Sequence, residues 1–553
     1  MEKRLLLAIV LSILVLASFQ YYAAKIAPQS EPGQIETREN KAGLSPQMTT
    51  GPTGHPDKQL TGGVSGETML PGQEASFPVI EAGESKVETS LFKAAISLNG
   101  AGVAGWQLKE YKNKDGQLIN LSCPERLASN LPLYIRWGSV SPLIFRGKEL
   151  LKLGFEQPQG ELFLQAQADP WRLDKKMAFS DQDYLFWLEL SWQNLSSETR
   201  KLPDYYLVCT PGFGLQDKEN RQYAEAKAGF VLGDTLKAKK WKIHSLTRKL
   251  IRRNAETGSI TRLDNELPGI VRWLAYRVKY FTIIIKPEEE AKGILFSGLG
   301  EDEALCQLKM PGEEVRPGET FNQRFAVYLG PVDYDQLKRA NLGLEAIFES
   351  GGLAPLRRLV MAVLKFFYKM VGNWGVAIIL LTIVAKIILL PLTQKSFRSM
   401  GEMQKLQPQI NSLRQVYKDN PQKLQKEIME LYRSHKVNPM GGCFPMLLQM
   451  PVFIALFTAL RSAIELRHAP FIFWIKDLSA KDPLYVLPIL MGGVMVAQQK
   501  MSPQADPQQA KMAMIMPIFF TFLFMNFPSG LVLYWLVNSF LSVGEQWWIK
   551  KKN

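Results

Sequence analysis

Cysteine and histidine are both scarce in this chain of 553 residues, which contains only four of each. The cysteines form no close pair and no spacing typical of metal ligands, and the histidines form neither a cluster nor a triad. A Walker-type phosphate-binding loop is missing as well. We therefore predict no metal site, no cofactor and no enzymatic activity. The residues concerned are Cys123, Cys209, Cys306, Cys443, His55, His244, His435 and His468.

Charge and apolar residues are unevenly distributed along the chain. The mean hydropathy of −0.07 would suit an average globular protein, but it averages a polar front half and an apolar back half. The net charge of +14 permits acidic partners such as RNA or anionic lipid. The position of the basic residues decides between such partners.

The first 77 residues are predicted to form an anchor and a linker. Lys3 and Arg4 precede an apolar stretch of about 20 residues, which is longer than the core of most signal peptides. We interpret residues 1–27 as a transmembrane anchor with its amino end in the cytoplasm, and a cleaved signal peptide is the alternative. Residues 28–77 have too few apolar side chains to fold, so we expect a disordered linker.

The next region, residues 78–345, is predicted to be a large all-β domain. Short runs rich in β-branched and aromatic residues recur between turn clusters, for example ELFLQAQA and YLFWLELSW. Because the anchor exports the residues on its carboxyl side, the domain should lie outside the cytoplasm. Its three cysteines would then meet an oxidising compartment, where either one disulfide or three isolated thiols would be consistent with the sequence.

From residue 353 the apolar pattern changes from strand to helix. Residues 353–369 are apolar on one side and basic on the other, which is typical of a helix on the membrane surface, and packing on the β domain is the alternative. Residues 370–549 then contain five apolar segments, and residues 550–553 form a basic tail. The segments are 371–392, 443–460, 484–499, 512–527 and 531–549. With the anchor, we expect six transmembrane helices.

Two of these segments are short for a membrane span. Residues 484–499 and 512–527 number 16 each, and at 1.5 Å per residue they reach about 24 Å, against a hydrocarbon core of about 30 Å. Such a mismatch is relieved by thinning of the bilayer or by water that reaches in from one side. We therefore expect a thinner or locally hydrated membrane near these two segments.

Basic residues predict the orientation and a cytoplasmic hairpin. Residues 393–442 carry nine Lys or Arg against four acids, so this stretch and both chain ends should be cytoplasmic. Within it, apolar spacings of three and four predict a helical hairpin at residues 394–437. A basic face is usually only solvated, but beside a membrane it makes RNA, a targeting factor or anionic headgroups candidate contacts. The candidate contact residues are Lys395, Arg398, Lys405, Arg414 and Lys418.

The most unusual residue is Lys386, which lies inside the apolar run of residues 376–392. A charge at that depth costs at least roughly 3 kcal/mol, so it normally faces protein or a water-filled cavity. Lys386 is about nine residues, or roughly 13 Å along a helix, from the cytoplasmic Lys395. Over this distance snorkelling alone would hardly bring the Lys386 ammonium to the membrane interface. We interpret it as a cation in a hydrated cavity, and a snorkelling lysine is the alternative.

Other polar residues interrupt the remaining apolar segments. Taken singly, each is more often a helix-to-helix hydrogen bond than a site, but together with Lys386 they would line a groove. They are Thr382, Gln449, Gln498, Gln499, Thr521, Asn526, Tyr534 and Asn538. Fifteen of the 20 methionines follow residue 360. Flexible thioethers suit a surface that receives varied apolar segments, although simple contact with lipid would also explain them.

The last 200 residues contain a series of distinctive motifs. They are VGNWG (371–375), PLT (391–393), KVNPMGGCFPMLLQMPVF (436–453), ELRHAPF (465–471), DLSAKDP (477–483), LPILMG (487–492), QKMSP (499–503) and FPSGLVLYW (527–535). Their order and spacing closely resemble those of the YidC membrane protein insertases. The anchor, linker and β domain resemble the Gram-negative form of this family. The resemblance implies a polytopic α-helical membrane protein of six transmembrane helices, with a five-helix insertase core and an all-β periplasmic domain of the β-supersandwich type.

The resemblance also implies a function, partners and site residues. The function is insertion and folding of nascent inner-membrane proteins through a hydrophilic groove open to the cytoplasm and to lipid. Membrane lipids and the Sec translocon are implied partners, with the ribosome and a targeting receptor as further candidates. In the family a cation, most familiarly arginine, receives polar parts of the incoming chain, and Lys386 matches it without the planar fork of arginine donors. Thr382, Gln449, Gln499, Tyr534 and Trp535 also match groove positions, Trp535 standing where tyrosine is common.

Two other functions compete with this hypothesis. In a transporter or channel, Lys386 would be a proton or anion site, but a through-going pore needs polar residues spread along its depth. In a carbohydrate-active enzyme, acids of the β domain would carry the chemistry, but Glu161, Asp183 and Glu189 show no pairing in the sequence. Ion flux in proteoliposomes tests the first alternative, and sugar binding to the β domain tests the second.

Overall fold

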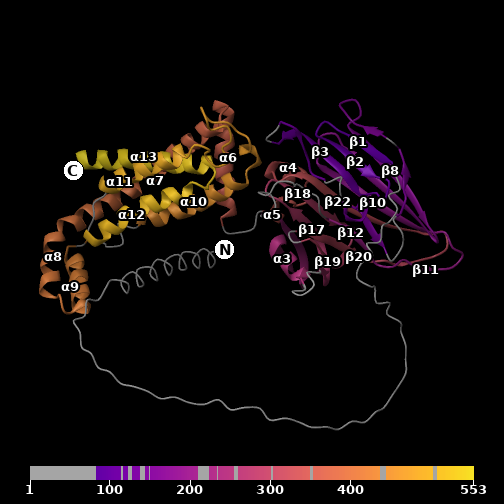
Figure 1. The fold of residues 1–553 in the computed structure, drawn as a ribbon, viewed down its shortest axis with the longest axis horizontal. Coiled ribbons are helices and arrows are strands. Elements are labelled where there is room, and N and C mark those ends of the chain that lie inside the picture. The colour runs from indigo at the N-terminus through magenta and orange to yellow at the C-terminus, as the bar shows by residue number, and fades with distance from the viewer. Residues whose placement is uncertain are drawn as a thin grey trace, which may run out of the picture. The chain divides into compact units, whose positions relative to one another are not determined.

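The structure is a computed structural model, and it describes most of the chain from residue 83 onward (Figure 1). The described ranges are 83–113, 116–122, 127–137, 143–148, 150–209, 223–232, 235–253, 260–300, 303–348, 353–435, 437, 444–501 and 507–552. The predicted anchor at residues 1–27 and linker at residues 28–77 lie outside them. The described chain forms a β-sheet domain followed by a helical region.

Two main sheets build the β domain. The smaller sheet runs in the order β4 (Leu118–Asn120), β3 (Val103–Lys112), β2 (Phe92–Ser97), β1 (Glu84–Glu88), β7 (Leu150–Lys152). The larger sheet has the strand order β5 (Ile135–Trp137), β12 (Tyr205–Val208), β20 (Glu303–Met310), β19 (Ala291–Gly300), β17 (Asp264–Arg277), β18 (Phe281–Pro287), β22 (Thr320–Pro331), β10 (Leu185–Asn194), β9 (Trp171–Ser180), β8 (Gln159–Ala168), β6 (Arg146–Gly147). Two further strands branch from β17: β13 (Glu225–Leu232) pairs with β17, and β14 (Thr235–Lys242) pairs with β13.

Smaller elements complete the domain. Two short pairs of strands are β11 (Arg200–Lys201) with β21 (Glu314–Val315), and β15 (Ile251–Arg253) with β16 (Ile260–Arg262). The helices are η1 (Ala128–Asn130), α3 (Ile243–Leu250), α4 (Tyr334–Arg339) and α5 (Glu345–Phe348). The prediction of a purely β domain was therefore incomplete, because α3 lies among the strands.

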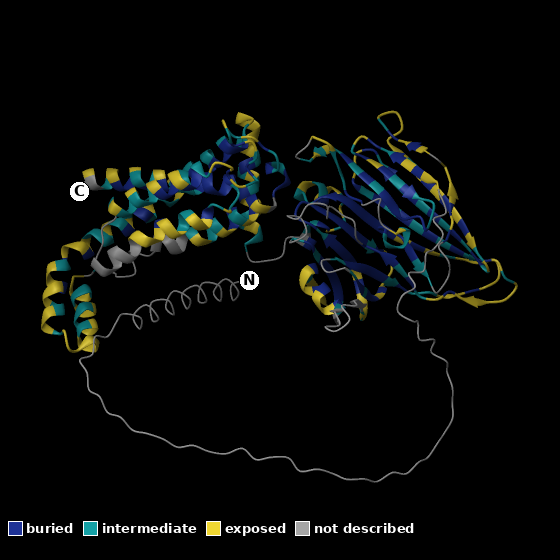
Figure 2. Ribbon diagram, viewed as in Figure 1, coloured by how far each residue is buried: buried dark blue, intermediate teal, exposed yellow. Residues whose placement is uncertain are grey.

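Aromatic side chains join the two main sheets. In β8, β9 and β10 buried and more exposed residues alternate, because successive side chains of a strand point to opposite faces (Figure 2). Phe92 and Trp106 of the smaller sheet stack at 4.0 Å between ring centroids. Trp106 in turn lies 5.6 Å from Phe186 of β10. The alternation of strands predicted from the sequence thus produces a core between facing sheets.

Two of the cysteines predicted to be exported lie in this core. Cys209 and Cys306 are buried free thiols, and the backbone N–H of Cys209 donates to the carbonyl of Cys306 at 2.8 Å. Cys123 and Cys443 lie outside the described residues. The two cysteines that the structure describes therefore form no disulfide.

One lysine is completely buried in the β domain. Lys175 occupies a core-facing position of β9, and its ammonium donates to the carbonyls of Ala101 and Leu133, each at 2.7 Å. Both acceptor residues have positive φ angles, 50° and 62°, which L-residues adopt only at a cost. Burial lowers the pKa of Lys175 to about 7. The lysine therefore fixes two strained turns from inside the core.

The C-terminal region is mainly helical, with a non-helical stretch at residues 467–485. It consists of α6 (Ala354–Val371), α7 (Trp374–Lys405), α8 (Gln407–Val416), α9 (Pro421–Ser434), α10 (Phe444–Ser462), η3 (Ile464–Leu466), α11 (Val486–Met501), α12 (Pro507–Phe524) and α13 (Ser529–Lys552). Among the described residues, α7 alone is long and apolar enough to cross a membrane by length and composition, and Gln449–Arg461 and Met514–Phe524 are shorter apolar helices. The count of six transmembrane helices stays a prediction.

The break between α6 and α7 has a local cause. Gly372 ends α6 with a left-handed φ of 67°, a conformation that glycine adopts without strain. The side chain of Asn373 then accepts hydrogen bonds from the backbone N–H groups of Gly375 and Val376 at 2.8 and 3.1 Å. This N-cap starts α7 at Trp374, three residues after the predicted start of the segment at 371.

Helix α7 also continues further than predicted. It runs through Pro391 to Lys405, so the first part of the predicted hairpin at residues 394–437 extends the apolar helix instead of forming a separate arm. The hairpin itself consists of α8 and α9, which contact each other. The Asn420 side chain caps α9 by accepting from the Lys423 N–H at 3.1 Å.

Helix α6 packs on the helical region. Its buried residues Val360 and Leu364 join the same apolar cluster as Ala377 of α7 and Ala459 of α10. On its polar side Lys365 forms an ion pair with Glu465 at 2.9 Å. This packing was not foreseen from the amphipathic pattern, and a position of α6 on the membrane surface stays a prediction.

Candidate functional site

The ammonium of Lys386 is paired with a carboxylate inside the helical region. Its Nζ lies 3.0 Å from Oε2 of Glu545, which comes from α13. The exposed fractions of the two side chains are 15% and 3%. A charge that is buried in this way needs a partner, because isolated charges are strongly disfavoured away from water. The predicted cation therefore exists as one half of a nearly neutral pair.

Hydroxyl groups extend the pair into a polar network between α7 and α13. Lys386 donates to Oγ of Ser542 at 2.7 Å, and Ser542 donates to the carbonyl of Asn538 at 2.9 Å. Thr393, two turns beyond Lys386 on the same face of α7, donates to Oε1 of Glu545. Each charged group thus has a hydroxyl partner in addition to the opposite charge. We call Lys386, Thr393, Ser542 and Glu545 the polar network.

The sequence contains a signal for this pair that the groove prediction did not use. Lys386 is the single cation in the five apolar segments predicted after residue 370, and Glu545 is their single acid. The reasoning that makes an intramembrane lysine notable applies equally to an intramembrane glutamate, and names each as the natural partner of the other. Thr393 and Ser542 could not be found in this way, because hydroxyl residues are common in packed helices.

Three predicted groove residues are engaged elsewhere. The hydroxyl of Thr382, one turn before Lys386, is buried and donates to the carbonyl of Ile378 at 2.6 Å. Gln449 of α10 donates through its side-chain amide to the hydroxyl of Tyr534 on α13, which is buried. The latter bond joins α10 to α13 and is separate from the polar network.

Trp535 lies in an aromatic cluster. Its ring is 5.0 Å from Phe453 of α10, 6.0 Å from Phe520 and 5.3 Å from Phe524, both of α12. These contacts join three helices through apolar rings. The structure therefore gives Trp535 a packing role between these helices, and its role in a polar groove stays a prediction.

The remaining candidates lie on α11, α12 and α13. Gln499 and Asn538 are half-buried and Asn526 is exposed just beyond the end of α12. Thr521 donates to the carbonyl of Pro517 at 2.7 Å and packs against Gly492 of α11. Of the predicted groove residues, the structure brings only Lys386 and the backbone of Asn538 to the polar network.

The contact between Gly492 and Thr521 leads to a prediction. A Cβ added at Gly492 would overlap the Thr521 side chain, whereas at the next residue, Gly493, it would meet open space. We expect Gly492→Ala to lower the free energy of unfolding by about 1–3 kcal/mol through overpacking. The matched variant Gly493→Ala should be neutral or slightly stabilising, since alanine favours helix. Thermal melting in detergent compares them, and equal melting temperatures would contradict the described packing.

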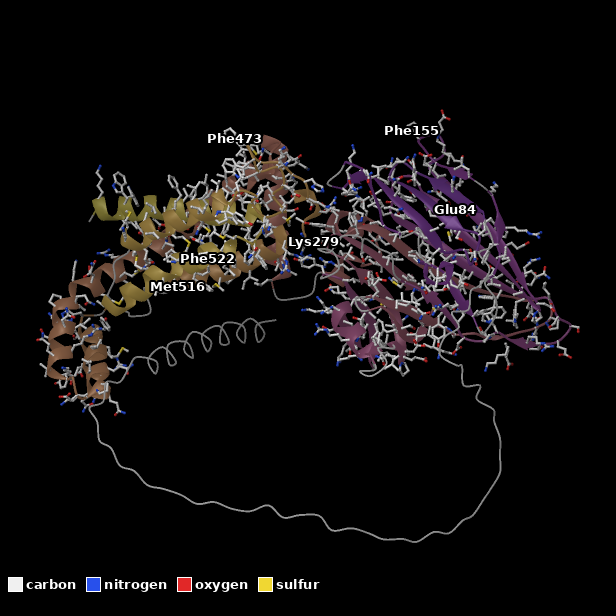
Figure 3. All side chains as sticks on the ribbon, viewed as in Figure 1. Glu84, Phe155, Lys279, Phe473, Met516 and Phe522 are labelled. Atoms are coloured by element: carbon white, nitrogen blue, oxygen red, sulfur yellow. The ribbon has the colours of Figure 1, made fainter. Side chains whose placement is uncertain are left out.

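The outer surface of α12 is apolar. Met514, Ile515, Met516, Ile518, Phe519, Phe522 and Leu523 are all exposed there. Met516 and Phe522 are labelled on this helix in Figure 3. On α10, Met450 and Ile454 are exposed as well. An apolar surface of this extent fits contact with lipid or with an apolar polypeptide segment.

Most of the predicted contact cations face solvent, and three of them lie on α7 and not in the hairpin of α8 and α9. Lys395, Arg398, Lys405 and Lys418 are exposed, and Arg414 is half-buried. Figure 2 shows mostly exposed and intermediate positions on α8 and α9. Among the described residues, no three His, Cys, Asp or Glu side chains gather as a metal site would require. The chemistry available at the polar network is the binding of charged and polar groups.

Comparison with known proteins matches almost all of the described chain. Residues 84–361 match the family model of the YidC periplasmic domain, and residues 366–553 match that of the 60Kd inner membrane protein. The membrane protein insertase YidC of Syntrophus aciditrophicus is 35% identical over 573 residues, covering 100% of both chains. That of Oleidesulfovibrio alaskensis is 33% identical over 578 residues, again covering 100% of both. A crystal structure of an active YidC insertase is 18% identical, with a TM-score of 0.36 over 84% of this chain and 92% of that one.

Proposed function

Since the chain belongs to the YidC family of membrane protein insertases, we propose that it inserts nascent proteins by holding their polar flanks at Lys386. The function of the chain is the insertion of proteins into the inner membrane, and its β domain is periplasmic. Its relatives are insertases and not enzymes. The proposal concerns how the residues of this chain carry out that function.

We propose six transmembrane helices with both chain ends in the cytoplasm. The five helices α7, α10, α11, α12 and α13 would follow the amino-terminal anchor. Support comes from the apolar segments, from the basic residues of α8 and α9, and from the positive-inside rule. The short segments within α11 and α12 would thin the bilayer locally. A thinner hydrocarbon layer lowers the barrier for a polar flank to cross.

In the proposed mechanism, two surfaces contact different parts of the incoming chain. Its apolar segment would lie along the exposed apolar faces of α10 and α12, and its polar or acidic flank would contact the ammonium of Lys386. The observation that carries this proposal is a cation deep in an apolar helix, with 15% of its side chain exposed. Transfer of the apolar segment into lipid, at about 25 cal/mol per Å² buried, would drive completion.

The partners beyond the nascent chain are proposed from the same features. The predicted contact cations, at the end of α7, in α8 and in the loop after α8, would contact the ribosome, a targeting receptor or anionic lipid headgroups, and each contact would weaken with salt. They are Lys395, Arg398, Lys405, Arg414 and Lys418. Cooperation with the Sec translocon is proposed from the family alone. Insertion of single-span substrates in proteoliposomes without Sec components would separate independent from assisted action.

The double variant Lys386→Met with Glu545→Gln tests the proposed function. It removes both charges together, so neither is left buried and unpaired. We expect insertion of substrates with acidic translocated flanks to fall about tenfold or more, the loss of roughly 1.4 kcal/mol of binding, while substrates with neutral flanks insert normally. The measurement is protease protection of translocated flanks in proteoliposomes. Normal insertion of the acidic substrates would reject the role of Lys386.

A further inference from the structure

The pairing of Lys386 with Glu545 raises a question about specificity. A cation that is already neutralised by an internal carboxylate attracts an acidic substrate less than a bare cation does. Yet the hydrogen bonding of the pair is incomplete. Oε2 of Glu545, the oxygen nearest Lys386, is buried and accepts no hydrogen bond of good geometry among the described residues. The contact is therefore held by electrostatic attraction and not by a full set of hydrogen bonds.

We propose that Glu545 is a displaceable internal counterion that sets the preference of the insertase for acidic flanks. It occupies Lys386 while no substrate is bound, gives way to a carboxylate of the incoming flank, and returns to expel that flank. This inference rests on the proposed function and adds to it a residue that determines specificity.

The hydroxyl partners allow the pair to open. When Glu545 moves away, Lys386 keeps its hydrogen bond to Ser542. Glu545 in turn keeps its hydrogen bond from Thr393, which lies two turns further along α7. Neither charged group is then left without a polar partner, which is the condition for separating a buried pair without a prohibitive penalty.

The exposure of the two side chains gives the exchange a direction. The Lys386 side chain is 15% exposed and the Glu545 side chain is 3% exposed. A carboxylate of the incoming flank thus reaches the Lys386 ammonium from the exposed part of the Lys386 side chain. Glu545 lies on the buried side of the same ammonium. Because Glu545 stays close and stays negative, it repels the bound acid. A bare cation would retain the flank, and the counterion promotes its release.

The test compares capture of two flanks by the full-length chain in proteoliposomes. Stalled nascent chains that differ only in carrying two aspartates or two asparagines in the flank are photo-crosslinked from position 538, one turn before Ser542 on α13. The readout is the ratio of acidic to neutral capture. A ratio within one preparation cancels differences in the amount of folded insertase. The variants are Glu545→Gln, Glu545→Asp and, as a control, Glu402→Gln.

We expect Glu545→Gln to raise this ratio roughly 5- to 10-fold, the size of an ordinary coupling between sites. Glu545→Asp keeps the charge on a shorter side chain, so its ratio should rise less. Glu402→Gln breaks the exposed pair with Lys405, 3.1 Å apart on the same helix, and should leave the ratio unchanged.

Unchanged or lower ratios in both Glu545 variants would overturn the inference. Failure of the proposed function looks different, because then the Lys386→Met, Glu545→Gln double variant keeps the wild-type preference for acidic flanks. If the double variant loses that preference while Glu545→Gln has no effect, Lys386 receives the flank and Glu545 does not compete for it.

Discussion

Replacing Lys386 with methionine alone is expected to lower the free energy of unfolding of the helical region by roughly 3–5 kcal/mol, because it leaves Glu545 buried and without its cation. The Glu545 side chain is only 3% exposed, and the one hydroxyl that remains to it, from Thr393, cannot balance a full charge. The measurement is thermal or urea-induced unfolding of the full-length chain in detergent, followed by circular dichroism at helical wavelengths.

Two further variants identify the cause of that loss. Adding Glu545→Gln to Lys386→Met should restore most of the stability, since an amide is far easier to bury than a carboxylate. Lys386→Arg keeps the charge and should keep most of the stability as well. If Lys386→Met and the double variant Lys386→Met, Glu545→Gln unfold alike, the ion pair does not stabilise the helical region. The geometry described for the polar network would then be wrong.

The β domain is expected to become more stable as the pH rises from 7 to about 9.5, by roughly 3 kcal/mol from Lys175 alone. Burial lowers the pKa of Lys175 from 10.5 in the unfolded chain to about 7 in the fold. Between these values the unfolded chain binds one more proton than the folded domain, so folding is favoured as protons become scarce. Below about pH 6 both states are protonated, and this contribution no longer changes with pH.

Lys175→Met isolates this effect from the other groups that titrate in the same range. The variant should lose the slope of about 1.4 kcal/mol per pH unit. It should also be less stable near pH 10, because the carbonyls of Ala101 and Leu133 lose their buried donor. Urea unfolding of the wild-type chain and of Lys175→Met, followed by tryptophan fluorescence from pH 6 to 10, measures the difference. If the free energy of unfolding depends on pH equally in the two proteins, Lys175 is not buried as described.

The β strands were predictable because their sequence periodicity is local. The runs ELFLQAQA and YLFWLELSW became β8 and β10, and their alternating burial follows from the strand geometry. The order of strands in the sheets could not be predicted, since it depends on contacts such as those of Trp106 with Phe186, which are 80 residues apart. The hydrogen bond from Lys175 to the carbonyl of Leu133 could not be predicted either, because it joins residues that are distant in the sequence.

Helix boundaries and side-chain partners were harder to predict. The apolar segment was predicted to end at residue 392, but α7 continues through Pro391 to Lys405. Lys386 was identified because an intramembrane charge is rare. Its pairing with Glu545 on α13 depends on how two distant helices pack, and so do the contacts that direct Tyr534 to Gln449 and Trp535 to an aromatic cluster.

The most direct test of the account locates the two parts of a substrate during insertion. Photo-crosslinkers at position 538, beside the polar network, and at Phe522, on the outer apolar face of α12, are combined with a stalled nascent chain that has an acidic flank and one apolar segment. We predict that position 538 captures the flank and Phe522 the apolar segment. Capture of the apolar segment at 538, or no capture of the flank there, would contradict the division of roles proposed for Lys386 and α12.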